Sequence, residues 1–178
     1  MTRPLRIALI SPKGPLYRKK GGIFRKSLRY MPLTLPTLAA LIPDELNAEV
    51  ICIDEGIEDV DLNLDVDLVG MTVITGTAPR AYGLAADFRN RGRTVVLGGP
   101  HVTLVPDDAQ PHADSIVTGY AEDEWPRLLR DFVHGQLEPR YTQSPHLDLS
   151  GFPHPDRRVL PRRRYLTSNV FEATRGCV

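Results

Sequence analysis

The residues best suited to hold a ligand are glycines, threonines and a histidine that follow short apolar runs. Gly98-Gly99-Pro100-His101 follows the apolar run 94–97. Two glycines at such a point let the backbone approach a bulky planar ligand that any Cβ would hold away, and a proline stiffens the exit. The same four residues also suit a plain strand-to-helix turn, so the sequence leaves both interpretations open.

A second group of polar side chains follows the apolar run 67–74. Thr72, Thr75 and Thr77 place three hydroxyls around Gly76, with Val73 between the first two. Threonine hydroxyls can donate to the amides or ring nitrogens of a ligand. They are equally suited to be turn and cap residues, so this group also has two interpretations.

His101 and two cysteines are the candidates for metal chemistry. A lone histidine more often satisfies a local hydrogen bond than binds a metal, so His101 alone does not define a metal site. Cys52 lies in an apolar run and is expected to be a small core residue, whereas Cys177 closes the segment Thr174-Arg175-Gly176-Cys177. Two cysteines give no disulfide framework, which agrees with a reducing compartment and a cytoplasmic location.

Length and charge limit the class of protein. A chain of 178 residues with 42% hydrophobic content suits one domain with a core and a short appendage, and no apolar run is long enough to span a membrane. The net charge is zero, but residues 1–30 hold nine Lys or Arg and no acid, and residues 151–178 hold six Arg against two acids. No aromatic residues interleave these basic ends in a nucleic-acid-binding pattern, so they favour solvated loops or contacts with an acidic neighbour.

The elements that must position these residues alternate along the chain. Apolar runs predict strands at 5–10, 49–53, 67–74, 94–97 and 115–118, and amphipathic stretches predict helices at 34–42, from Pro79 onward, and at 123–134. In the last helix Trp125, Leu128, Leu129 and Phe132 share one face. Trp125 is therefore expected in the core.

Nearly continuous apolar strands separated by helices indicate a parallel sheet covered on both faces. The fold class is α/β, a doubly wound, Rossmann-like or flavodoxin-like domain with a five-stranded parallel sheet and flanking helices over residues 1–140. Ligands of such sheets bind at the carboxyl ends of the strands. The loops to consider therefore begin at Ser11 and cover 72–76, 98–102 and 119–122.

Four segments together carry a family resemblance: 31–40 (MPLTLPTLAA), 67–72 (DLVGMT), 96–103 (VLGGPHVT) and 117–122 (VTGYAE). They resemble the N-terminal cobalamin-binding domain of cobalamin-dependent radical S-adenosylmethionine enzymes, over residues 5 to about 134. Residues 147–157 are similar to that family's linker, and Thr174-Arg175-Gly176-Cys177 looks like the start of its CxxxCxxC cluster loop. The resemblance implies that residues 141–178 are a linker and the first strand of a radical S-adenosylmethionine barrel that is missing from this chain.

The resemblance also implies a corrinoid lying over the strand ends. Gly98 and Gly99 would pack against it, with Thr72 and Thr75 near its nucleotide tail. The other residues expected to line the cleft are Ser11, Val73, Gly76, His101, Val102, Gly119 and Glu122. The DxHxxG sequence of histidine-ligated cobalamin proteins is absent, and the first loop reads Ser11-Pro12-Lys13-Gly14. This absence argues against the histidine-ligated type of cobalamin protein.

A [4Fe–4S] cluster needs three thiolates from such a loop and an open iron for S-adenosylmethionine. Cys177 would be the first of the three, so the cluster and S-adenosylmethionine are expected only in a longer parent protein. The chain itself is expected to bind cobalamin without turnover. Catalysis, such as methyl transfer, would then belong to a barrel supplied in cis or in trans.

Two other classes of function remain open. The fold also suits a flavodoxin-like nucleotide-binding module, although neither GxGxxG nor a P-loop follows the first strand. A protein-docking module that has lost the ligand is the third possibility. It would use the basic ends, where segments 19–22 and 162–164 are expected to be mobile or dependent on a partner.

Overall fold

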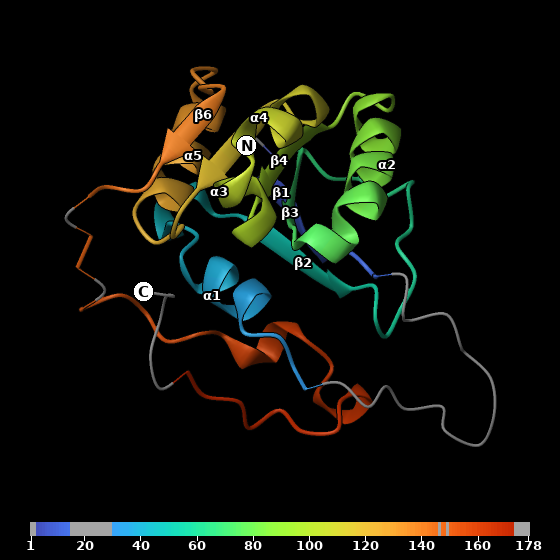
Figure 1. Ribbon diagram of the computed structural model, residues 1–178. Coiled ribbons are helices and arrows are strands. Elements are labelled where there is room, and N and C mark those ends of the chain that lie inside the picture. The colour runs from blue at the N-terminus through green and yellow to red at the C-terminus, as the bar shows by residue number, and fades with distance from the viewer. Residues whose placement is uncertain (1–2, 15–29, 146, 149, 173–178) are drawn as a thin grey trace.

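The computed structural model describes residues 3–14, 30–145, 147–148 and 150–172 (Figure 1). Within these residues one parallel sheet has the strand order β2-β1-β3-β4-β5-β6. The strands are β1 (Arg6–Ser11), β2 (Glu49–Asp54), β3 (Leu68–Thr72), β4 (Thr94–Gly98), β5 (Ser115–Thr118) and β6 (Arg140–Thr142). The predicted parallel α/β architecture of the Rossmann-like kind is confirmed, but the predicted count of five strands is wrong, because the sheet has six.

The sixth strand was missed because it carries almost no apolar signal. Of its three residues only Tyr141 is buried, and Arg140 and Thr142 are exposed. Its pairing with β5 is parallel, and the Tyr141 hydroxyl donates to Asp131 Oδ2 at 2.9 Å. The strand is therefore held at the sheet edge by one side chain and by backbone pairing.

Helices cover both faces of the sheet (Figure 1). On one face α2 (Ala78–Arg89), α3 (Pro100–Leu104) and α4 (Pro106–Ala109) contribute to a single apolar cluster with the strands. On the other face α1 (Thr34–Ala40) and α5 (Glu124–Val133) contribute to a second cluster. Short 3-10 turns complete the structure: η1 (Asp44–Leu46), η2 (Thr75–Thr77), η3 (Gln110–His112), η4 (Arg157–Val159) and η5 (Arg162–Arg164).

Trp125 and Cys52 are core residues, as predicted. Trp125 is 2% exposed, and its indole Nε1 donates to the Leu38 carbonyl at 3.1 Å, so its polar atom is satisfied within the core. Cys52 lies in the same apolar cluster. Gly70 of β3 makes room for the indole, because a Cβ there would lie 3.2 Å from Trp125 Cη2 and 3.1 Å from Leu9 Cδ2.

The C-terminal segment folds back onto the sheet domain and passes alongside α1 (Figure 1). Leu160 and Tyr165 are buried in the cluster that α1 and α5 share. Backbone hydrogen bonds join Met31 N to the Thr167 carbonyl at 3.1 Å and Asp156 N to the Pro36 carbonyl at 2.9 Å. Residues 150–172 thus complete one face of the domain, and the division expected at residue 140 stays a prediction.

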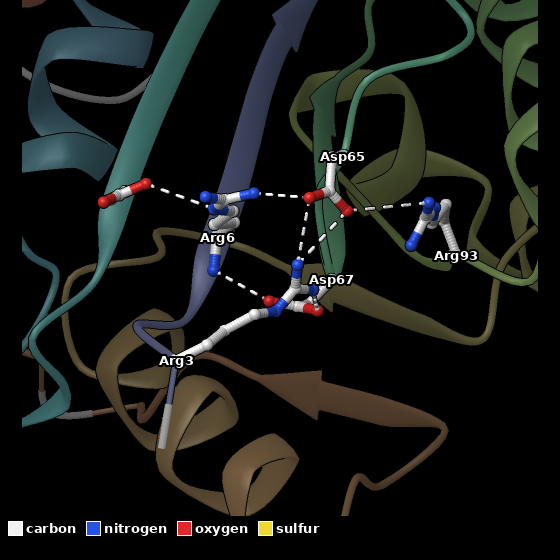
Figure 2. Close-up of polar contacts among 6 residues, drawn as sticks. Arg3, Arg6, Asp65, Asp67 and Arg93 are labelled. Atoms are coloured by element: carbon white, nitrogen blue, oxygen red, sulfur yellow. Dashed lines mark hydrogen bonds and ion pairs between the residues drawn. The ribbon is translucent and has the colours of Figure 1, made fainter. Parts of the chain in front are cut away.

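Part of the uneven charge is neutralised within the chain. Arg164, in the segment expected to be mobile, pairs with Glu58 at 2.9 Å, whereas segment 19–22 lies outside the described residues. At the amino edge of the sheet, arginines before and within β1 form an ion network with two aspartates that precede β3 (Figure 2). In that network, Arg3 contacts Asp65 at 3.1 Å and also pairs with Asp67.

The same network connects three strands at their amino ends. Asp65 also pairs with Arg6 and lies 3.9 Å from Arg93, and the Arg6 backbone N–H donates to Asp67 Oδ2 at 2.9 Å (Figure 2). The hydrogen bond and charge of Arg3 hold the pKa of Asp65 below its ordinary value. The network therefore holds the amino ends of β1, β3 and β4 together, at the edge of the sheet opposite the predicted ligand-binding loops.

Candidate functional site

The predicted loops meet at one edge of the sheet. Because every strand runs parallel, Ser11, Thr72, Gly98 and Gly119 all lie at or directly after the carboxyl ends of their strands. The sheet register pairs Thr72 with Gly98. The chain order reverses between β1 and β3, and a crevice at such a reversal is where doubly wound sheets bind ligands.

The Gly98-Gly99 turn is held tightly against the end of β3. Val73 N donates to the Gly98 carbonyl at 2.8 Å, and His101 N donates to the Val73 carbonyl at 3.0 Å. Gly99 has φ +102°, and a Cβ there would lie 2.9 Å from both Val73 N and Val73 O. The chain itself therefore requires Gly99, whereas a Cβ at Gly98 would make only ordinary contacts with Val117 at 3.6 Å or more.

The loop after β3 separates its threonines into different roles. Thr77 is buried, and its hydroxyl accepts from Ile74 N at 3.2 Å, so it serves as a turn and cap residue. Thr75 and Gly76 are exposed, and a Cβ on Gly76 would meet nothing within 4 Å. Ile74 is 55% exposed beside them. This loop presents an apolar side chain, a hydroxyl and an open space at the carboxyl edge.

His101 takes part in a local hydrogen-bond network, in line with the cautious interpretation of a lone histidine. Its Nδ1 lies 3.3 Å from Thr75 Oγ1, and its Nε2 lies 3.0 Å from the Tyr82 hydroxyl and 3.2 Å from Asp108 Oδ2. Hydrogen bonds from Tyr82 and His101 lower the pKa of Asp108, while burial and Asp108 raise the pKa of Tyr82. Tyr82 and Asp108 were not predicted as site residues, because Tyr82 lies on α2 and Asp108 on α4, outside the loop segments expected to bind a ligand.

Several predicted site residues lie beneath the edge. Val73 and Val102 are fully buried in the apolar cluster under α2 and α3, so their side chains support the loops from below. Glu122 is 2% exposed and Ser11 is 9% exposed. Thr72 is half-buried at the end of β3.

Gly119 joins the loops that follow β4, β5 and β6. Its φ is +83°. The Gly119 N–H donates to Thr103 Oγ1 at 2.9 Å, and the Thr103 hydroxyl in turn donates to the Gly99 carbonyl at 3.0 Å. Tyr120 N donates to Gln143 Oε1 at 2.7 Å, and a Cβ on Gly119 would collide with the same Gln143 side chain. The glycine therefore allows three loops to be bonded together.

Glu55, which follows β2, was not predicted, yet it anchors the first loop. Its side chain is fully buried and accepts from Lys13 N at 3.1 Å and from Arg80 Nη2 at 2.6 Å. Burial alone would raise its pKa, but the hydrogen bonds and charges of Arg80 and Lys13 outweigh burial and lower it. A lone acid after a strand carries no sequence signal for this role, since its partners are distant along the chain.

Other features lie away from this edge. Cys177, expected to be the first cluster ligand, lies outside the described residues. Among the residues that the structure does describe, no group of three His, Cys, Asp or Glu is placed to hold a metal ion, and no helix is long and apolar enough to cross a membrane. A shallow polar groove lined by Arg89, Asn90, Arg93 and Asp114 lies at the amino edge, across the sheet from the predicted loops.

Comparison with known proteins identifies a domain family. A family model described as "B12 binding domain" matches residues 31–129, more than half of the chain. The match includes α1, the loops after β3, β4 and β5, and most of α5.

Three curated methyltransferases are also similar. Over 110 residues the chain is 42% identical to a bacteriochlorophyllide d C-8(2)-methyltransferase of Chlorobaculum tepidum, covering 61% of this chain and 24% of that protein. It is 30% identical over 115 residues to a bacteriochlorophyllide d C-12(1)-methyltransferase of the same organism, covering 62% of this chain and 25% of that protein. It is 33% identical over 118 residues to an uncharacterized methyltransferase of Pyrococcus horikoshii, covering 59% of this chain and 25% of that protein. The chain spans about a quarter of the length of these relatives.

Proposed function

The chain belongs to the B12 binding domain family, and from that membership we propose that it binds a cobalamin across the carboxyl edge of its sheet. The observation that carries the proposal is the meeting of the loops after β3, β4 and β5 at that edge, inside the matched region. A corrin is a broad, flat ligand with amide groups around its rim. A set of loops at one edge suits it better than an enclosed pocket.

The residues at this edge fit such a ligand. Ile74 offers an exposed apolar surface, Thr75 offers a hydroxyl, and Gly76 leaves free the space that a side chain would fill. Gly99 and Gly119 hold the neighbouring loops close to the strand ends. In this proposal the exposed loop residues contact the ligand, and the buried residues Val73, Val102 and Glu122 support them.

His101 is not available to the cobalt in this arrangement. Its Nε2 faces Tyr82 and Asp108, its Nδ1 faces Thr75, and the residue is 8% exposed. We therefore assign His101 to the protein's own hydrogen bonds. Cobalamin, when bound, would supply the cobalt chemistry by which methyl groups are transferred, while this chain's residues bind and orient it.

A wider proposal concerns the whole protein. Similarity to three methyltransferases supports a role in methyl transfer, with this domain as the cobalamin-binding part. We propose that a radical S-adenosylmethionine barrel with a [4Fe–4S] cluster acts beside it, in cis or in trans. This rests on the resemblance of Thr174-Arg175-Gly176-Cys177 to the start of a cluster loop.

The binding proposal is tested by titrating the purified chain with hydroxocobalamin, followed by gel filtration and a visible absorption spectrum of the protein peak. Co-elution of the corrinoid with a shifted spectrum is expected. A folded chain that elutes colourless at every cobalamin concentration would overturn the proposal and favour a module without this ligand.

A matched pair of glycine variants locates the ligand. Gly76→Leu places a side chain in open space at the carboxyl edge, so the fold should persist while cobalamin affinity falls by at least about tenfold, roughly 1.4 kcal/mol. Gly83→Leu, also in open space but on α2, should bind as the wild type does. Equal affinity in both variants would move the ligand away from the loop after β3.

The wider proposal predicts that this chain alone does not turn over S-adenosylmethionine. A cluster loop needs three thiolates, and the chain has two cysteines, of which Cys52 is buried in the core. Cleavage of S-adenosylmethionine by the reduced, iron-reconstituted chain would contradict this division of labour.

A further inference from the structure

A chain of hydrogen bonds runs from the exposed loop after β3 to Asp108 of α4. Thr75 Oγ1 lies 3.3 Å from His101 Nδ1, and His101 Nε2 lies 3.2 Å from Asp108 Oδ2. The Tyr82 hydroxyl lies 3.0 Å from the same Nε2 and donates to Asp108 Oδ2 at 2.7 Å. The Tyr82 ring stacks on His112 at 3.9 Å, which fixes the position of the hydroxyl.

These contacts assign the tautomer of His101. Tyr82 has one hydroxyl hydrogen, and it is directed at Asp108, so the tyrosine oxygen can only accept from the imidazole. Asp108 Oδ2 is likewise an acceptor, because it receives the Tyr82 hydroxyl hydrogen, and this hydrogen bond is the main cause that lowers the pKa of the exposed Asp108 carboxyl. Two acceptors facing Nε2 require a hydrogen on that nitrogen.

The tautomer in turn sets the direction of the Thr75 hydroxyl. In the neutral form of the imidazole, a hydrogen on Nε2 leaves a lone pair on Nδ1, and in that form Nδ1 accepts the hydrogen of Thr75 Oγ1. Thr75 is exposed, and its oxygen lone pairs remain available on the side away from the imidazole. At Thr75 the loop therefore presents a hydrogen-bond acceptor, because the hydroxyl hydrogen of this residue is directed at His101.

We propose that Thr75 accepts a hydrogen bond from an amide N–H on the rim of the ligand, and that His101, held by Asp108 and Tyr82, is the positioning residue that sets this polarity. The inference rests on the proposed cobalamin-binding function, because the corrin rim carries carboxamide groups. An acceptor at this position favours such N–H donors over a phosphate oxygen. The network thus selects which part of the ligand lies over the loop after β3.

The tautomer is tested in the ligand-free chain by nitrogen-15 NMR of labelled histidine. His101, identified by comparison with His101→Gln, should show a protonated Nε2 and an unprotonated Nδ1. Asp108→Ala, at an exposed position, should weaken that preference without unfolding the chain. A proton on Nδ1 in the neutral wild-type protein would overturn the inference without reference to any ligand.

The role of Thr75 is tested by hydroxocobalamin titration. Thr75→Val should weaken binding about 3- to 10-fold, the effect of one hydrogen bond, and Thr75→Ser should bind as the wild type does. His101→Gln should also weaken binding, and combining it with Thr75→Val should add little, because both act through one hydroxyl. Thr94→Val, at the amino end of β4, is the control and should have no effect.

The outcomes separate the two proposals. If the wild type binds cobalamin and Thr75→Val binds equally well, the role of Thr75 is wrong and the binding function stands. If the wild type does not bind, both the binding function and the Thr75 contact fail, while the tautomer is still decided by the NMR measurement.

Discussion

The Tyr165 hydroxyl donates a hydrogen bond of 3.1 Å to Asp54 Oδ2, and both side chains are buried. Asp54 is the last residue of β2, and Tyr165 lies 111 residues later in the C-terminal segment. The other carboxylate oxygen of Asp54 accepts from Gly56 N at 2.9 Å. This contact joins the C-terminal segment to the carboxyl edge of the sheet, next to Ser11 at the end of β1, with which Asp54 pairs in the sheet register.

Tyr165→Phe should therefore destabilise the fold by about 1–3 kcal/mol, because the buried Asp54 carboxylate loses a hydrogen bond while the aromatic ring stays in place. The measurement is chemical denaturation monitored by circular dichroism. Tyr30→Phe is the matched control: Tyr30 is 63% exposed, so its variant should stay within about 0.5 kcal/mol of the wild type. Equal stability of the two variants would show that the Tyr165 contact contributes nothing.

Gly70→Ala should destabilise the core by about 1–3 kcal/mol through overpacking. The added Cβ would lie 3.1 Å from Leu9 and 3.2 Å from Trp125, and both side chains are buried in the core. Trp125 is the sole tryptophan of the chain, so its fluorescence reports the displacement directly.

Gly83→Ala is the control for this substitution. It lies within α2, where a Cβ meets nothing within 4 Å, so the variant should be stabilised by about 0.4–1 kcal/mol as a helix interior gains alanine. A loss of stability in Gly83→Ala comparable to that in Gly70→Ala would contradict the packing explanation.

Arg80→Met should destabilise the fold by about 2–3 kcal/mol at neutral pH, since it leaves the Glu55 carboxylate buried without its main partner. This value lies below that for a wholly buried pair because the Arg80 side chain is 39% exposed and partly screened by solvent. Arg89→Met on the same helix is the control. Arg89 pairs with Asp114, whose side chain is 33% exposed, so losing this ion pair should lower the free energy of unfolding by under about 1 kcal/mol.

The Glu55 contribution should depend on pH with a definite sign. The pKa of Glu55 in the folded wild type lies below the ordinary 4.5, so its stabilisation is complete above pH 4.5 and is lost as pH falls through the lower folded value. In Arg80→Met, burial should instead raise this pKa. Urea denaturation at several pH values should show a difference between wild type and variant that shrinks on acidification, and a constant difference would argue against this pair.

Cys52 should resist alkylation in the native protein. Burial, with a smaller effect from Asp156, raises the pKa of its thiol to about 12, so almost no thiolate is present at neutral pH. Mass spectrometry of the Cys52 peptide after iodoacetamide treatment should show modification only when urea is present. Rapid labelling of this peptide in native conditions would contradict its place in the core.

The sequence by itself determined the class of fold and the location of the loops. Five strands could be predicted because each holds a short run of β-branched or other apolar residues. In β1, β3, β4 and β5 these residues are buried on both faces of the sheet, as Val95, Val96 and Leu97 are in β4, whereas β2 is buried only from Cys52 to Asp54. Parallel strands bring their carboxyl ends to one edge wherever helices connect them. The run Gly98-Gly99-Pro100-His101 therefore predicts the position of this edge from the sequence alone.

Only the tertiary structure decided what each of these residues does. Gly99 is required by the backbone of Val73, and His101 is bonded to Tyr82 and Asp108, yet these partners are separated in sequence and carry no motif. β6 shows the same limit, because Tyr141 alone is buried in it and its strand exists through pairing with β5. Hydrophobic periodicity is local and can be read along a chain, whereas hydrogen bonds and close backbone contacts depend on which distant segments folding brings together.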